Sequence, residues 1–192
     1  MFKPLIEQEE IDASRESRER GWLGMGSYVS SFEKKVKEIL QAPDRHVAAV
    51  STGTAGLHIA LLLAGVGPGD EVIVSAFNCS ADYQAITWVG ADIVFCDCTD
   101  DTLELDLVKA ASLVGPRTKA IIVMDYDCII SNHEEIAAFA ERHKLRVIHD
   151  AAHSFGSSYK GRMVGSFSDI CVFSHDPVKT VTCLDGGTVV VR

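Results

Sequence analysis

The sequence predicts a three-layer α/β/α fold on a mainly parallel β-sheet. Short apolar segments with strand character alternate with helix-like segments along most of the 192 residues. Glycine-containing turns separate these segments, and the clearest turn spans residues 65–70. Alternation of this kind places the strands in one sheet with helices on both of its faces. In such sheets, ligands bind beyond the carboxyl ends of the strands.

The elements follow a polar, glycine-punctuated segment, residues 1–29, which is expected to form an arm with a short helix. Phe32, Val36 and Leu40 recur at helical spacing, so an amphipathic helix is predicted over 30–41. The domain itself is expected to span residues 30–192. The strands are predicted at 46–51, 71–75, 92–96, 119–124, 146–149, 169–173 and 188–191, and the further helices at 54–65, 80–88, 105–113 and 132–143.

The composition limits the classes of protein to which the chain can belong. With 47% hydrophobic residues, a chain of this length can bury a substantial core as one domain. The formal net charge of -9 argues against nucleic acid as a partner, because surfaces that bind the phosphate backbone are basic. No run of about 18 apolar residues occurs, so no membrane-spanning segment is expected.

The cysteines and the N-terminus indicate a cytoplasmic protein. The N-terminal segment is acidic and lacks the apolar core of a secretory signal. The six cysteines lie mostly within apolar runs, which is typical of reduced core thiols rather than of a disulfide framework. Cys96-Asp97-Cys98 resembles half of a metal site, but no second pair has ligand spacing, so no metal site is expected.

Three stretches carry residues that could take part in catalysis or ligand binding. Lys179 lies in an irregular segment between two buried strands. It is either a solvated loop residue or a lysine whose amine is fixed in a site. Residues 51–56 are small and join a strand to an apolar helix, which leaves backbone N–H groups free for a phosphate or simply starts a helix. Asp150 ends a buried strand, where it is either a helix cap for residues 151–155 or a partner for a positive group.

The three stretches together match the needs of pyridoxal phosphate. This cofactor requires a lysine for a Schiff base, an acid that keeps the pyridine nitrogen protonated, and a cradle for the phosphate. Ser51, Asp150 and Ser174 all fall at the carboxyl ends of predicted strands, so the motifs are expected to converge on one crevice.

With these motifs, the chain resembles the DegT/DnrJ/StrS sugar aminotransferases, which are fold-type-I pyridoxal phosphate enzymes that aminate nucleotide-linked keto-sugars. The resemblance extends over nearly the whole chain. It rests on residues 21–33, Ser51-Thr52-Gly53-Thr54-Ala55, residues 67–73, Asp150-Ala151-Ala152-His153, and Phe173-Ser174 followed by Lys179 and Gly186-Gly187. The resembled enzymes continue into a smaller C-terminal domain, so the chain is expected to correspond to their N-terminal large domain.

The resemblance implies a role for each matching residue. Lys179 would form the Schiff base and move the proton during transfer, and Asp150 would pair with the pyridine nitrogen. His153 would lie against the cofactor ring near its phenolic oxygen, although histidines in such places are often structural. The phosphate would be held by Ser174 and by Gly53, Thr54 and Ala55, through backbone N–H groups and the Thr54 hydroxyl.

The sequence departs from the family pattern in two places. Cys79 occupies the position of the aromatic residue that usually stacks on the ring, so either a thiol packs there or Phe77 takes over from a neighbouring position. The usual His-x-Tyr-Gly segment reads Met124-Asp125-Tyr126-Asp127-Cys128, which adds charge near the site.

These features predict a pyridoxal phosphate-dependent aminotransferase that acts from glutamate or glutamine onto a nucleotide-linked keto-sugar, as a homodimer. Two alternatives remain at the level of sequence. One is another type-I pyridoxal phosphate reaction, although related sugar dehydratases carry histidine in place of Lys179. The other is a non-catalytic binding or regulatory protein on the same fold.

Overall fold

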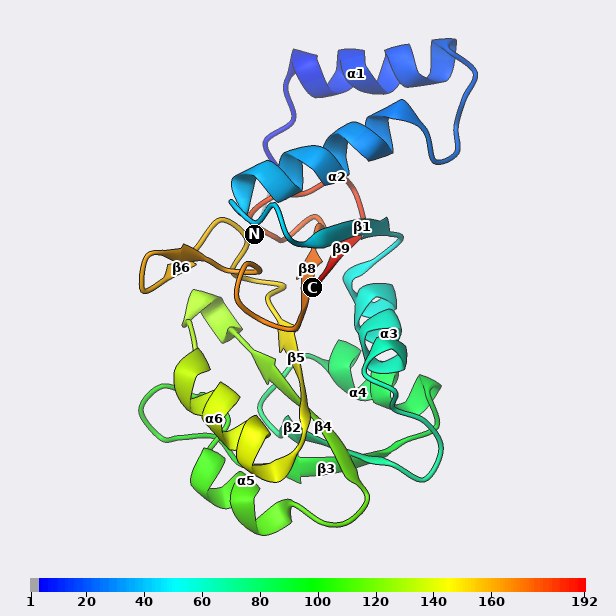
Figure 1. Cartoon of the computed structure of the whole chain (residues 1–192). Helices are drawn as coiled ribbons and strands as arrows, with labels where there is room; N and C mark the ends of the chain where they lie inside the picture. Colours follow the sequence, from blue (N-terminus) through cyan, green and yellow to red (C-terminus); the bar gives the residue numbers. More distant parts are fainter. Residues whose placement is uncertain (1–3) are drawn as a thin grey trace.

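The computed structural model describes residues 4–192 and confirms the predicted fold class (Figure 1). A seven-stranded sheet has the order β1-β9-β8-β5-β4-β2-β3. Its strands are β1 (His46–Val50), β2 (Glu71–Ser75), β3 (Asp92–Cys96), β4 (Thr118–Met124), β5 (Arg146–Asp150), β8 (Ile170–Ser174) and β9 (Gly187–Val191). Most are rich in valine and isoleucine, which suits strands buried on both faces.

The sheet is parallel except at one strand. β3, β2, β4, β5 and β8 pair in parallel, whereas β9 runs antiparallel to both of its neighbours, β8 and β1. Because β9 reverses the direction twice, β1 runs the same way as β8. The carboxyl ends of β1, β5 and β8 therefore lie along one edge of the sheet, as the sequence predicted.

Helices cover both faces of the sheet, and the alternation of side chains along each strand decides which residues meet them. The helices are α1 (Gln8–Glu19), α2 (Ser27–Ile39), α3 (Gly53–Leu63), α4 (Ser80–Trp88), α5 (Leu107–Leu113) and α6 (His133–His143). α3 and α4 share one core with Ile122 and Ile148. α5 and α6 pack on the opposite face, against Ile121 and Val123, and α2 packs on that face against Phe173.

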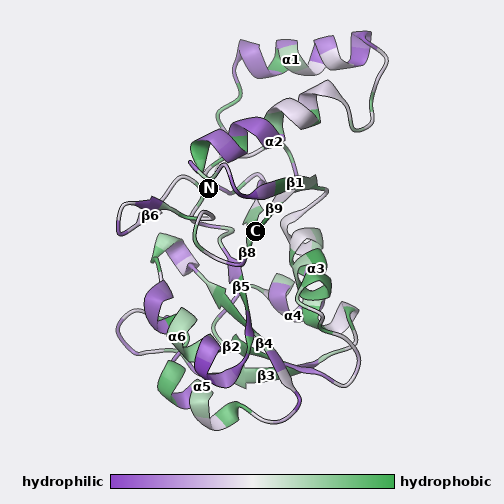
Figure 2. Cartoon of the chain, viewed as in Figure 1, coloured by the Kyte–Doolittle hydropathy of each residue, from purple (hydrophilic) through white to green (hydrophobic). Residues whose placement is uncertain are grey.

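α2 lies beside β1, and α1 lies beyond α2, away from the core (Figure 1). α1 buries none of its residues, and Figure 2 shows it largely in the hydrophilic colours, unlike the strands at the centre. α2 begins at Ser27, earlier than the predicted residue 30, and so crosses the expected boundary between residues 29 and 30. The division into an arm and a domain stays a prediction.

Other differences from the predicted elements have local causes. α5 begins at Leu107 rather than at 105, because the Asp106 side chain accepts hydrogen bonds from Val108 and Lys109 and caps the helix. The hairpin of β6 (Ser158–Tyr159) and β7 (Arg162–Met163) was not predicted, since its strands are too short to show alternation. Within residues 4–192, no helix has both the length and the apolar character needed to cross a membrane.

Candidate active site

A cavity of about 520 Å³ opens where the carboxyl ends of the strands meet the first turn of α3. Its wall contains six of the eight residues predicted for the cofactor: Gly53, Thr54, Cys79, Asp150, Ser174 and Lys179. Ala55 and His153 lie nearby but are not part of this wall. The structure therefore brings together three motifs that are far apart in the chain.

The first turn of α3 forms one end of the cavity. Thr52 is the N-cap residue, and its Oγ1 accepts a hydrogen bond of 2.9 Å from the amide of Ala55. That amide is thus already engaged, which leaves the amides of Gly53 and Thr54 as the first-turn donors that face the cavity wall. Together with the hydroxyls of Thr54 and Ser174, they make a site suited to a phosphate.

Gly53 allows α3 to approach β8 closely. A Cβ atom on Gly53 would lie 2.8 Å from the Cβ of Ser174 and 3.0 Å from its Oγ. Gly56 has the same role one turn later, where an added Cβ would lie 2.7 Å from Cγ1 of Val172. The helix N-terminus and the Ser174 hydroxyl can converge on one ligand only because these positions lack side chains.

Replacing Gly53 with alanine is expected to weaken binding of pyridoxal phosphate by about tenfold or more, which is about 1.4 kcal/mol. The added methyl group would push the first turn of α3 away from Ser174. A fluorescence titration with the cofactor measures the change. Gly67→Ala is the matched control, because an added Cβ there meets nothing within 4 Å. Equal affinities for the two variants would contradict this account.

Asp150 is the last residue of β5 and is 1% exposed. Its Oδ1 accepts a hydrogen bond of 2.9 Å from the amide of Ala152, in a turn rather than a helix, so the alternative of a helix cap has no helix to act on. Burial raises the pKa of Asp150 to about 6. A cationic group at the cavity, such as a protonated ring nitrogen, would favour its ionised form.

Asp82 of α4 is a second buried carboxyl close to Asp150, and sequence reasoning did not identify it. It is 0% exposed, Asn78 Nδ2 donates a hydrogen bond of 2.5 Å to Oδ2, and Oδ1 is without a partner in the described structure. Burial and the negative charge of Asp150 raise the pKa of Asp82. Its position in a helix of mixed polarity gives no sequence signal.

Lys179 lies half-buried in the loop between β8 and β9, on the wall of the cavity. Its amide donates a hydrogen bond of 2.9 Å to the carbonyl of Asp176, while Asp176 Oδ1 accepts one from the amide of Val178. The loop thus carries its own turn structure. Asp176 and Asp185 also line the cavity, so its wall carries acidic residues besides the lysine.

His175, to which the sequence assigned no role, anchors the lysine loop. It is buried, its Nε2 lies 2.7 Å from Thr188 Oγ1, and its Nδ1 lies 3.1 Å from the carbonyl of Val181. Its own carbonyl accepts hydrogen bonds from Thr182 Oγ1 and from the amide of Cys183. His175 thereby ties both ends of the loop to β9. A polar residue directly after a buried strand is the only hint of this in the sequence.

His153 lies beside the segment that follows β4. Its Nδ1 accepts a hydrogen bond of 3.1 Å from the amide of Asp127, so the proton of the neutral ring sits on Nε2. Burial, and next the positive charge of Lys179, lower the pKa of His153. His153 is therefore a neutral donor within electrostatic reach of the lysine, which is compatible with the predicted ring contact.

The structure separates the two candidates for the stacking residue. Cys79 is the N-cap of α4 and lines the cavity. Phe77 is absent from the cavity wall and packs on Tyr126, with ring centroids 4.7 Å apart, and Tyr126 in turn contacts His153. Of the two candidates, Cys79 is therefore the residue that lines the cavity.

The residues present fit pyridoxal phosphate. The cavity has the size of a small-molecule site, with phosphate donors at one end, a buried carboxyl at the base and a lysine amine on the wall. The close contact of Gly53 with Ser174 shows that the phosphate end is shaped by the chain itself.

Comparison with known proteins gives concordant results. The model of the DegT/DnrJ/EryC1/StrS aminotransferase family matches residues 4–192. The spore coat polysaccharide biosynthesis protein SpsC of Bacillus subtilis (strain 168) is 40% identical over 184 residues, which cover 96% of this chain and 47% of SpsC. The chain therefore spans about half the length of that relative.

Solved structures share the architecture. Spr1654 from Streptococcus pneumoniae, described as a sugar aminotransferase and solved in its PMP form, superimposes with a TM-score of 0.95 at 29% identity, over 100% of this chain and 52% of its own. The same protein has also been solved in its PLP form. The aminotransferase TlmJ from Streptoalloteichus hindustanus superimposes with a TM-score of 0.93 at 34% identity, again over 100% of this chain and 52% of its own.

Proposed function

Because the chain belongs to the DegT/DnrJ/EryC1/StrS aminotransferase family, we propose that it is the cofactor-binding part of a sugar aminotransferase. It would move an amino group from glutamate or glutamine onto a nucleotide-linked keto-sugar, in polysaccharide or secondary-metabolite biosynthesis. The observation that carries this proposal is the single cavity whose wall contains Lys179, Asp150 and the N-terminus of α3.

Each of these residues has a defined task. When bound, pyridoxal phosphate supplies an aldehyde that accepts the amino group and a ring that stabilises negative charge at the substrate carbon. Lys179 would hold the cofactor through Nζ and, once released, would carry the proton taken from the substrate carbon. Asp150 would keep the ring nitrogen protonated, and the first turn of α3 would fix the phosphate together with Ser174.

The sugar acceptor is supported by two relatives: Spr1654 is described as a sugar aminotransferase, and SpsC as a polysaccharide biosynthesis protein. The cavity also has polar side chains that are not assigned to the cofactor: Gln84 and Asp185 line it and belong to none of the cofactor motifs. A cytoplasmic location is supported by six cysteines that are all free thiols.

The experiment that tests the cofactor assignment is an absorbance spectrum of the purified chain with pyridoxal phosphate, followed by borohydride reduction and peptide mapping. The expected result is a visible band, and a reduced cofactor attached to the peptide that contains Lys179. Attachment to another lysine, or free cofactor alone, would overturn the assignment. The sugar acceptor is tested separately, by assaying nucleotide-linked keto-sugars with glutamate or glutamine as donor.

The chain is also expected to associate with itself, as a homodimer, rather than to remain a monomer of 20.8 kDa. Large apolar side chains on α3 and α4 are half-exposed, namely Leu62 (54%), Leu63 (52%) and Trp88 (56%), and Figure 2 shows hydrophobic colours along α3. Exposed apolar surface of this kind favours association, most commonly as a closed two-fold dimer. Light scattering measures the mass, and a monodisperse monomer would contradict the expectation.

Binding of the cofactor by these 192 residues alone is expected to be weak, and amino transfer poor. The relatives are about twice as long, so part of the surface around the cavity would come from residues outside this chain.

A further inference from the structure

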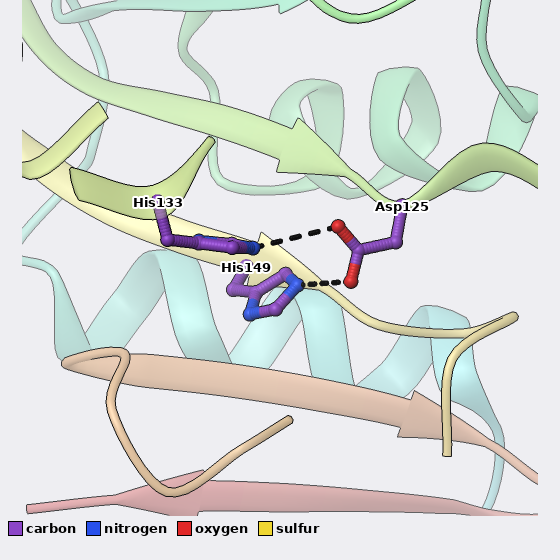
Figure 3. A group of neighbouring side chains, drawn as sticks. All are labelled: Asp125, His133 and His149. Atoms are coloured by element: carbon purple, nitrogen blue, oxygen red, sulfur yellow. Dashed lines mark hydrogen bonds and ion pairs between the residues drawn. The ribbon is translucent and has the colours of Figure 1, made fainter. Parts of the chain in front are cut away.

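A second polar cluster is formed by Asp125, His133 and His149 (Figure 3). It lies on the face of the sheet that α5 and α6 cover, opposite the cofactor cavity. Asp125 directly follows β4, His133 is the first residue of α6, and His149 precedes Asp150 on β5. Side chains alternate along a strand, so His149 points away from the face to which Asp150 points. One nitrogen or oxygen atom of each residue lies within 4.8 Å of the corresponding atoms of the other two, and all three residues are buried.

Only some of the polar atoms in this cluster have hydrogen-bond partners. His149 Nε2 lies 2.7 Å from Asp125 Oδ2. His133 Nε2 points at Asp125 Oδ1 from 3.4 Å but lacks hydrogen-bond geometry, and it has no other partner in the described structure. The residue is 8% exposed, so this nitrogen is a buried polar atom that is unsatisfied.

Ser131, whose amide contacts the same carboxylate, carries another unsatisfied atom. The amide of Ser131 donates a hydrogen bond of 3.2 Å to Asp125 Oδ1, while the buried Oγ of Ser131 has no partner in the described structure. Buried polar groups are nearly always paired, so the unsatisfied His133 nitrogen that faces the Asp125 carboxylate indicates a missing partner, such as a water or a cation.

The orientation of His149 is compatible with a metal ligand in one of its two tautomers. Its Nδ1 lies 2.8 Å from Ser168 Oγ. If Nδ1 donates to this hydroxyl, the lone pair of Nε2 faces the Asp125 carboxylate, and a cation has to lie between them. That cation is either a proton on Nε2 or a metal ion. An imidazole whose second nitrogen is held by an outer partner is the usual arrangement of a metal ligand.

We propose that Asp125, His133 and His149 form a zinc-binding site, with water in the fourth position. Two histidines and one carboxylate are a common donor set for zinc. Zinc–ligand bonds of about 2.0–2.1 Å at tetrahedral angles place the ligand atoms about 3.3 Å apart. The separation of 3.4 Å between His133 Nε2 and Asp125 Oδ1 is close to this value. The 2.7 Å between His149 Nε2 and Asp125 Oδ2 is a hydrogen-bond distance, which has to lengthen when zinc replaces the proton.

The cluster has an entry path and a structural purpose. A separate cavity of about 300 Å³ is lined by His133, Phe167 and Ser168, so it reaches the cluster from the side of α6. An ion bound there would join the end of β4, the start of α6 and β5. It would displace the proton between Asp125 and His149, and would need no contribution from the cofactor site.

The test uses the purified 192-residue chain, treated with a chelator and checked by circular dichroism. Calorimetric titration with Zn²⁺ is expected to give one site per chain, and bound zinc should raise the melting temperature. Co²⁺ serves as a spectroscopic probe, and its tetrahedral bands should appear without a thiolate charge-transfer band. A strong thiolate band would place the ion at cysteines and overturn the proposal.

His133→Gln is the decisive variant, because His133 is absent from the wall of the cofactor cavity. It is expected to weaken zinc binding at least tenfold and to abolish the melting shift, while circular dichroism stays unchanged. His143→Gln, at the other end of α6, is the matched control and should bind zinc as the unaltered chain does. Stoichiometric zinc in His133→Gln would show that His133 is not a ligand and would overturn the proposed site. No zinc in the unaltered chain at micromolar concentration would mean that only a proton bridges Asp125 and His149.

Discussion

Lys179→Ala is expected to abolish the covalent attachment of pyridoxal phosphate and, in the complete enzyme, to reduce amino transfer to background. The residue supplies the amine on the cavity wall, and its loop is held by His175 rather than by the lysine side chain. The fold should therefore survive. Loss of the visible band and of the borohydride-stable adduct is the measurement.

Two controls separate chemistry from charge in this experiment. Lys179→Arg keeps the positive charge but cannot form the covalent link, so it should behave like the alanine variant. Lys160→Ala removes an exposed lysine of the β6–β7 hairpin, which pairs with Glu134 of α6, and should leave the adduct unchanged. A borohydride-stable adduct on Lys179→Ala would show that another lysine anchors the cofactor.

Asp150→Asn is expected to lower turnover of the complete enzyme by about 100-fold or more while cofactor stays bound, because a neutral amide cannot hold the ring nitrogen protonated. The phosphate contacts at α3 and Ser174 are untouched by this change. Steady-state kinetics and a cofactor titration measure the two effects. Turnover within tenfold of the unaltered enzyme would reduce Asp150 to a residue of the turn.

The same variant should be more stable than the unaltered chain when the cofactor is absent and the pH is high. Burial raises the pKa of Asp150 to about 6, from an ordinary value of 3.8. The folded state therefore binds the proton more tightly, so this contribution to stability is complete below about pH 3.8 and is lost as the pH rises through 6. At pH 8, the buried carboxylate costs up to about 3 kcal/mol, which asparagine removes.

Urea unfolding of the cofactor-free proteins at pH 8 and near pH 4 measures this cost. The advantage of Asp150→Asn should be present at pH 8 and shrink towards pH 4. Asp100→Asn, which alters an exposed acid, should show no such trend. An equal effect at both pH values would show that the change acts through packing rather than through ionisation.

The sequence predicted the fold and the place of the site because both depend on local patterns. Alternating strands and helices fix a parallel sheet, and the ends of its parallel strands must meet, so Gly53, Asp150 and Ser174 could be expected together. The hairpin of β6 and β7 was beyond prediction, because its two-residue strands carry no periodicity.

The remaining residues depend on contacts between segments that are distant in sequence. Asp82 and His175 are buried by elements that the sequence does not place next to them, and their environment follows only from packing. Likewise, Asp125, His133 and His149 come from three separate elements, and only the register of β4 with β5 brings them together. Phe77 was a candidate for stacking because sequence spacing cannot show that its ring packs on Tyr126.

The antiparallel strand β9 also has a consequence for how the chain folds. β1 is the first strand in the chain and β9 the last, yet β9 is the neighbour through which β1 joins the sheet. The parallel strands β2 to β5 pair over shorter separations, and contacts between distant segments form more slowly than local ones. The part of the cavity that carries Asp150 can therefore assemble early. The helix that receives the phosphate packs on β9 as well as on β8 and α4, so its support is complete only when residues 187–191 join the sheet. We therefore expect competence to bind cofactor to be one of the last properties that folding produces.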